Sequence, residues 1–251
     1  MSTRELTLNL RKRELRNDAG GHACWATVES SITVPAAKIA ITVCDMWDDH
    51  WSRGAAERVA EMAPRMDQVL AHARSAGVQI VHTPSDTMEH YDGTPARARV
   101  LAAPPLSLPE DLEHADPPLP IDDSDGGSDT GEKPSHRAWR TQHPLLSIDQ
   151  QRDGISDDGA EVYRYLRHLA CRQIFIMGVH TNMCVLHRSF GIKQMVRWGM
   201  DIALVRDLTD TMYNPASSPY VSHEEGTRLV VEFIEAFWCP TVHSAGLCCP
   251  L

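Results

Sequence analysis

The strongest constraint on the fold is an alternation between short apolar runs and longer segments with helical periodicity. Four runs are nearly continuous in apolar residues and rich in β-branched side chains, as strands buried on both faces are: residues 38–44, 78–82, 173–177 and 201–205. Four segments carry apolar residues at helical spacing: residues 54–76, 161–169, 184–198 and 222–237. Such alternation predicts right-handed βαβ units, and therefore a three-layer, doubly wound α/β fold with a parallel β-sheet.

An N-terminal extension precedes this alternation. Residues 6–10 (LTLNL) and 25–34 are extended runs, and a Gly-Gly turn lies between them near residues 18–21. This pattern predicts a hairpin, so we expect one domain over residues 1–251 with a β-extension at residues 1–34. Because a hairpin offers an unpaired edge that needs cover, we also expect a homo-oligomer.

A second irregular segment interrupts the alternation. Residues 104–144 are dense in Pro, Asp, Gly and Ser, and we expect a loop insertion there, either a solvated surface segment or a lid. Its run IDDSDGGSD lacks the closing Glu of a helix–loop–helix calcium site, so a calcium role is not favoured. A further strand is expected directly after the insertion, at residues 145–148.

Composition excludes several classes of function. The 251 residues contain 24 basic and 34 acidic side chains, and the net charge of -10 argues against nucleic-acid or anionic-membrane partners. No apolar run approaches the ~20 residues that span a bilayer. The seven cysteines are odd in number and irregularly spaced, which indicates a reduced, cytoplasmic chain.

Two reactive side chains follow predicted strands. Asp45 ends the run at residues 38–44, and Cys184 comes shortly after the run at residues 173–177. Ligands of open parallel sheets bind beyond the carboxyl ends of the strands, so these two side chains are candidates for one site. A thiol at a helix start is expected to have a lowered pKa, and a carboxylate beside it can move its proton. Burial of Cys184 as a small apolar residue, or use of Asp45 as a helix cap, remains open.

The segments IAITVCDMWDDHW and GVHTNMCV together resemble the isochorismatase-like cysteine hydrolases, which include nicotinamidases and carbamoyl-amide hydrolases. The resemblance covers about residues 38–244 and implies the same doubly wound fold. It implies that Asp45 is the catalytic acid and base, that Cys184 is the nucleophile, and that the Val179–His180 peptide is cis beside the oxyanion. It also matches Asp207 to an acidic residue that often follows the fifth strand.

The chain departs from this family at the catalytic lysine. The resemblance places that lysine after the strand expected at residues 145–148, where the sequence has none. A thiolate and a carboxylate in one pocket repel each other, so we expect another cation there. Arg140 is the first choice, because it leads into the expected strand, and His50 and Lys133 follow.

Further pocket residues and a metal are also open. His50 and His180 flank the acid and the nucleophile, and Trp47 is expected to form an apolar wall. No cofactor is required by the resemblance. A single divalent ion such as Zn²⁺, bound by Asp86 and His90, is an alternative to a plain surface loop.

The predicted function is that of an amidohydrolase. We expect cysteine-dependent hydrolysis of a C–N bond, other than a peptide bond, in a small amide or carbamoyl compound through a thioester. One alternative is a non-catalytic ligand-binding or scaffold protein that has lost the lysine. Another is vinyl-ether hydrolysis of the isochorismatase type, which the presence of Cys184 disfavours.

Overall fold

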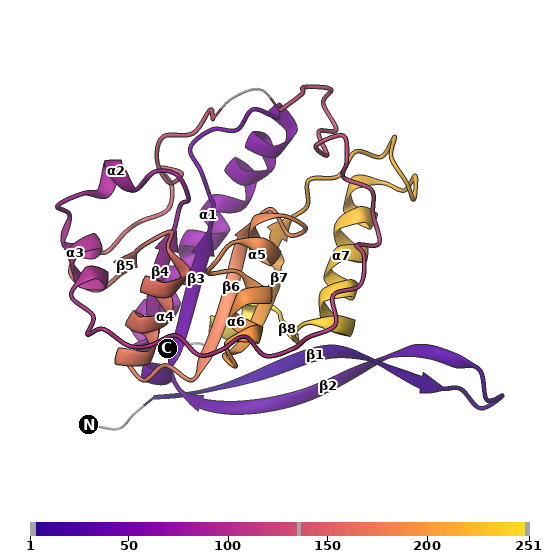
Figure 1. Cartoon of the computed structure of the whole chain (residues 1–251), viewed down its shortest axis with the longest axis horizontal. Coiled ribbons are helices and arrows are strands. Elements are labelled where there is room, and N and C mark those ends of the chain that lie inside the picture. The colour runs from indigo at the N-terminus through magenta and orange to yellow at the C-terminus, as the bar shows by residue number, and fades with distance from the viewer. Residues whose placement is uncertain (1–3, 135–136, 249–251) are drawn as a thin grey trace.

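A computed structural model describes residues 4–134 and 137–248, so the first three residues of the predicted extension lie outside it. The described strands form one eight-stranded sheet in the order β2-β1-β8-β7-β6-β3-β4-β5 (Figure 1). The strands from β8 to β5 run parallel, and β1 and β2 join them antiparallel. The strand bounds are β1 (Glu5–Asn17), β2 (Ala23–Pro35), β3 (Ile39–Cys44), β4 (Gln79–Thr83), β5 (Gly154–Ile155), β6 (Gln173–Val179), β7 (Asp201–Asp210) and β8 (Thr241–Val242).

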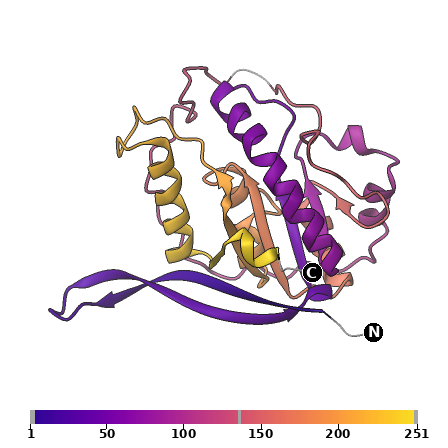
Figure 2. The same cartoon turned by 180° about the vertical axis from the view of Figure 1, so that it is seen from behind.

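Helices cover both faces of the sheet, which confirms the predicted fold class. The long helix α1 packs on one face and is seen in front of the sheet in Figure 2. Helices α4 to α7 pack on the other face (Figure 1). The helix bounds are α1 (Arg53–Ala76), α2 (Met88–Tyr91), α3 (Pro95–Leu101), α4 (Gly159–His168), α5 (Cys184–His187), α6 (Ile192–Arg197) and α7 (His223–Phe237), with 3-10 turns η1 (Ala36–Lys38) and η2 (Ser244–Leu247).

Strands β3 and β6 lie side by side at the centre, and each of their residues is buried. This explains their unbroken apolar sequences, because a strand covered on both faces has no solvent side. Gly178 ends the pairing opposite Cys44, and a Cβ at Gly178 would lie 2.0 Å from the Cys44 carbonyl oxygen. The close approach brings the carboxyl ends of the two strands together, which is where the candidate side chains follow.

Two predicted elements are wrong. Residues 145–148 form a loop in which the Leu145 side chain is 52% exposed, and β5 (Gly154–Ile155) pairs with β4 instead. The helix predicted over residues 184–198 is broken into α5 and α6. The break occurs at Arg188, whose backbone is extended, and at Gly191, where a Cβ would lie 2.8 Å from the carbonyl oxygen of Val185. Apolar periodicity continues across the break, so the sequence pattern could not reveal where the helix is interrupted.

The N-terminal hairpin is longer than predicted and extends past the body of the domain (Figures 1 and 2). Its inner end is anchored by Leu6, Leu8 and Leu10, which are buried in the core on the α1 face of the sheet. Among residues 4–134 and 137–248, no helix combines the length and apolar character that crossing a bilayer requires.

Candidate active site

Asp45 is fully buried directly after β3, in a backbone conformation with φ of 45°. Its Oδ1 accepts a hydrogen bond from the backbone N–H of Ser85 at 2.7 Å, and its Oδ2 lies 3.3 Å from Nε of Arg188. Burial raises the pKa of Asp45 to about 6, against the opposing effects of Arg188, Cys184 and Ser85. A carboxyl group with this pKa accepts and returns protons near neutral pH.

Cys184 is the first residue of α5, and its thiol donates a hydrogen bond to the carboxylate of Asp45. Burial, and then the negative charge of Asp45, raise the pKa of this thiol above its usual range, while Arg188 opposes the shift. The expectation of a lowered thiol pKa is therefore wrong for the resting site. A thiol that keeps its proton needs a base before it can act as a nucleophile, and Asp45 is the carboxyl group in contact with it.

Arg188 supplies the cation that the sequence leaves unassigned. Its Nε pairs with Asp45 at 3.3 Å, its Nη2 pairs with Asp86 at 3.0 Å, and the guanidinium also contacts the thiol of Cys184. The expectation of a replacement cation is confirmed, but the choice of Arg140 is wrong. Arg140 is exposed in the loop, where its backbone N–H donates to Asp48. The sequence did not point to Arg188, because this residue lies one turn after Cys184 in the helix predicted over residues 184–198. An unbroken helix gives no sign of a contact between Arg188 and Asp45.

An aromatic cluster adjoins the cis peptide bond between Val179 and His180. Trp47 stacks on Trp139 at 4.1 Å between ring centroids, and His50 stacks on Trp139 at 5.6 Å. The rings of His50 and His180 are 4.9 Å apart, which brings the two predicted histidines together. Burial lowers the pKa of His50 to about 4 and that of His180 to about 3, so neither ring carries a charge at neutral pH.

Asp86 and His90, the residues proposed to bind a divalent ion, contact different neighbours. The Asp86 carboxylate binds Arg188, while the ring of His90 lies edge-on to Tyr91 within α2. Within residues 4–134 and 137–248, no group of three or more His, Cys, Asp or Glu side chains is placed to hold a metal ion. The structure instead places Asp86 in an ion pair with Arg188.

The match of Asp207 to a residue beyond the fifth strand is corrected by the structure. Strand β7 continues to Asp210, so Asp207 lies within it and pairs with Arg65 at 2.7 Å. The strand is longer than its apolar run, and the residue at its carboxyl end is Asp210. Its carboxylate accepts from Arg58 at 2.8 Å and lies 2.9 Å from Nε2 of His223.

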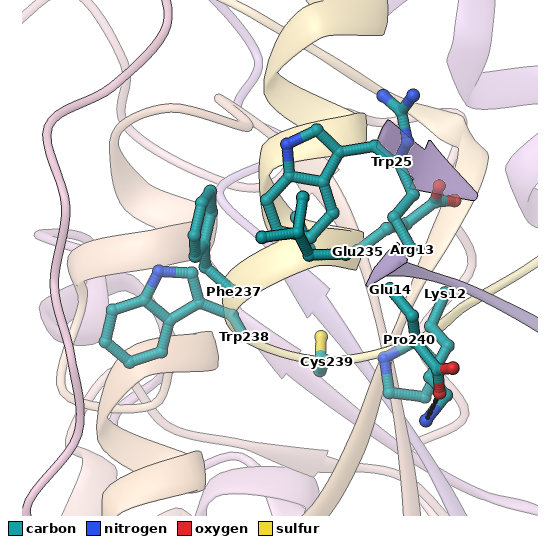
Figure 3. Close-up of a pocket in the computed structure, with 11 residues that line it drawn as sticks. Lys12, Arg13, Glu14, Trp25, Glu235, Phe237, Trp238, Cys239 and Pro240 are labelled. Carbon is teal, nitrogen blue, oxygen red and sulfur yellow. Dashed lines mark ion pairs between the residues drawn. The ribbon is translucent and has the colours of Figure 1, made fainter. Parts of the chain in front are cut away.

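A cleft of about 390 Å³ opens over the nucleophile, and its lining joins α5 to the long insertion: Leu119, Asp123, Asn182, Met183, Cys184, His187 and Arg188. A larger groove of about 470 Å³ lies between the hairpin and the end of α7, where Figure 3 shows Trp25, Phe237 and Cys239. Burial raises the pKa of the Cys239 thiol, and Glu235 raises it further. The cleft, and not the groove, therefore holds a thiol with an acid and a cation in contact.

Comparison with solved structures identifies the fold. A cysteine hydrolase from Pseudomonas syringae pv. phaseolicola 1448A is similar, with a TM-score of 0.54 and 14% identity over 86% of this chain and 92% of that chain. An isochorismatase family protein from Burkholderia thailandensis aligns at a TM-score of 0.47 and 12% identity, over 84% of this chain and 93% of that chain. No family model matches the sequence, and no curated protein does so either.

The chain is thus an α/β protein with a cysteine, a carboxylate and a guanidinium grouped at the carboxyl edge of its parallel sheet. Its fold is similar to that of the cysteine hydrolase from Pseudomonas syringae pv. phaseolicola 1448A.

Proposed function

We propose that the protein hydrolyses a C–N bond in a small amide or carbamoyl compound, as a nicotinamidase-related amidohydrolase. The observation that carries this proposal is the contact of Cys184 and Arg188, which line an open cleft, with the buried carboxyl group of Asp45. A thiol needs a base to become a nucleophile, and the base needs a nearby cation to remain ionised when buried. In this proposal Cys184 is the nucleophile, Asp45 is the base and Arg188 is the cation.

The reaction begins when Asp45 takes the proton of the Cys184 thiol. The thiolate attacks the substrate carbonyl, and backbone N–H groups near His180 and Cys184 stabilise the oxyanion. Asp45 returns its proton to the nitrogen, the C–N bond breaks, and ammonia or an amine leaves. Water then attacks the thioester while Asp45 removes its proton, and the thiol is released with the acid product. Arg188 supplies charge and orientation only, because a guanidinium does not give up its proton.

The contacts of Arg188 and Cys184 also bear on the two alternative functions, a non-catalytic binding protein and a vinyl-ether hydrolase. A non-catalytic binding protein was suggested by the missing lysine, but the positive charge that lysine would supply is present beside Asp45. Vinyl-ether hydrolysis does not use a cysteine nucleophile, and it gives no reason for the Cys184 thiol to contact the buried carboxyl group of Asp45. Both observations support the amide reaction over its competitors.

The direct test is capture of the thioester. We expect a panel of small amides and carbamoyl compounds, quenched in acid during turnover, to leave an acyl group on Cys184 that intact-protein and peptide mass spectrometry detects. Hydroxylamine should remove it, since thioesters react with this nucleophile. Turnover of an amide without any adduct on Cys184, after rapid quenching over the full time course, would contradict the proposed mechanism.

We propose that a second copy of the chain covers the free edge of β2. Strand β1 pairs with β8 only at Leu10 and Arg11, and two-stranded ribbons are marginally stable alone. We expect sedimentation of the unchanged protein at micromolar concentration to show an oligomer. A double substitution, Thr27→Lys with Ser31→Lys, adds charge to exposed positions of β2 and is expected to yield monomers. A monomeric unchanged protein would reject this interface.

A cytoplasmic location completes the proposal. Five cysteines in the described part of the chain are free thiols, which fits a reducing compartment: Cys24, Cys44, Cys171, Cys184 and Cys239.

A further inference from the structure

The acid-rich part of the insertion is bonded to the body of the domain, although Asp122 and Asp125 stay exposed. Asp123 lines the cleft beside Cys184, from a position about sixty residues earlier in the chain. The flanking acidic residues each bind a different part of the body, at distances of 2.7 to 3.2 Å: the Asp122 N–H to Ser218 O, the Asp125 carboxylate to Asn214 and Ser217, and the Asp129 carboxylate to Arg58. The segment therefore forms one wall of the cleft. Asp123 lines the cleft, and its neighbours hold the segment against the body of the domain.

Asn182 holds the Asp123 carboxylate in a defined orientation. The Asn182 side chain is 1% exposed, and its Nδ2 donates to Asp123 Oδ2 at 2.6 Å and to the Met212 carbonyl oxygen at 3.0 Å. Its Oδ1 accepts from the Met212 N–H at 3.0 Å, so the amide is fully used. Asn182 lies two residues before the nucleophile, which couples the position of Asp123 to that of the reacting sulfur.

The charged side chains that line the cleft are Asp123 and Arg188. Arg188 is the one cation among the residues that line it, and Asp45 and Asp86 already share that guanidinium. Burial, followed by the charge of Lys193, lowers the pKa of His187, whereas the charges of Asp116 and Asp123 oppose this shift. Asp123 has no cationic partner of its own among the lining residues. A substrate entering the cleft therefore meets an anion beside the site of attack.

We propose that Asp123 selects substrates that present an N–H donor or a positive charge beside the scissile carbonyl, and rejects substrates that carry a carboxylate there. This inference rests on the proposed function and narrows its substrate class to neutral or cationic amides and ureides. A carboxylate substrate would place two like charges together in a partly desolvated cleft, whereas an N–H group finds a ready acceptor. A bound cation would also lower the pKa of the Cys184 thiol and so favour attack.

The test uses thiol reagents of opposite charge. The protein is treated with 2-aminoethyl methanethiosulfonate, a cation, and with 2-sulfonatoethyl methanethiosulfonate, an anion, and the rate of modification of Cys184 is followed by mass spectrometry. We expect the cation to react faster, and Asp123→Asn to lower the ratio of the two rates roughly tenfold, as removal of one charge near the sulfur predicts. The matched control Asp122→Asn changes an exposed neighbour that does not line the cleft, and its ratio should equal that of the unchanged protein. Equal ratios in all three proteins would overturn the role of Asp123.

A second measurement does not depend on the thiol. In a Cys184→Ser background, binding of the isosteric series acetamidinium, acetamide and acetate is followed by saturation-transfer NMR. We expect acetate to bind most weakly, and to gain relative to acetamidinium when Asp123→Asn is added. If Cys184 resists both reagents while this charge preference persists, the nucleophile assignment fails and the substrate class stands. If acetate binds as well as acetamidinium with Asp123 present, the substrate class fails.

Discussion

Replacing Cys184 with serine is expected to reduce kcat/KM for amide hydrolysis by about 10⁴-fold or more, which is typical for loss of a covalent nucleophile. A serine hydroxyl has a far higher pKa than a thiol, and Asp45, with a pKa of about 6, is too weak a base to activate it. The substitution exchanges one small atom, so the fold should be retained. Steady-state kinetics and far-UV circular dichroism measure the two effects separately.

The matched control for this variant is Cys24→Ser. Cys24 is an exposed residue of β2 that does not line the cleft, so its replacement should leave kcat/KM unchanged. Turnover by Cys184→Ser at a rate near that of the unchanged protein would remove Cys184 from the mechanism, provided that circular dichroism shows a folded chain.

Arg188→Gln is expected to lower kcat/KM by about 10²- to 10³-fold, the range seen when one preorganised electrostatic contact is removed from an active site. The guanidinium lowers the pKa values of both Asp45 and Cys184. Without it, Asp45 should protonate at higher pH, so the acid limb of the kcat/KM profile should move from about 6 to a higher value. Asp45 must be ionised to act as the base, and activity is therefore lost over a wider acidic range.

Two further variants separate charge from geometry. Arg188→Lys keeps the positive charge but not the paired contacts to Asp45 and Asp86, so we expect partial recovery of the rate and of the acid limb. Arg228→Gln removes an exposed arginine of α7 that pairs with Glu225, and it should change neither quantity. If Arg188→Gln shifts neither the rate nor the acid limb, Arg188 has no part in activating the thiol.

Much of the fold could be predicted from local sequence. Continuous β-branched runs identify buried strands, because only a strand covered on both faces lacks a polar side. These runs predicted β3, β4, β6 and β7 and placed Asp45 and Cys184 at their ends. The prediction was wrong where two structures share one pattern: residues 145–148 are apolar enough for a strand but lie in a loop, and periodicity runs unbroken across the interruption between α5 and α6.

Short-range patterns and strand position were enough to predict the doubly wound sheet and the acid and thiol at its edge. The cation that faces Asp45 depended on tertiary packing, because Arg188 reaches the carboxylate at a backbone break that apolar periodicity does not reveal. Tertiary packing also decided that Asp86 binds Arg188, and that Asp123 forms a wall of the cleft. These contacts join residues far apart in the chain, and their geometry depends on how loops pack against the finished sheet.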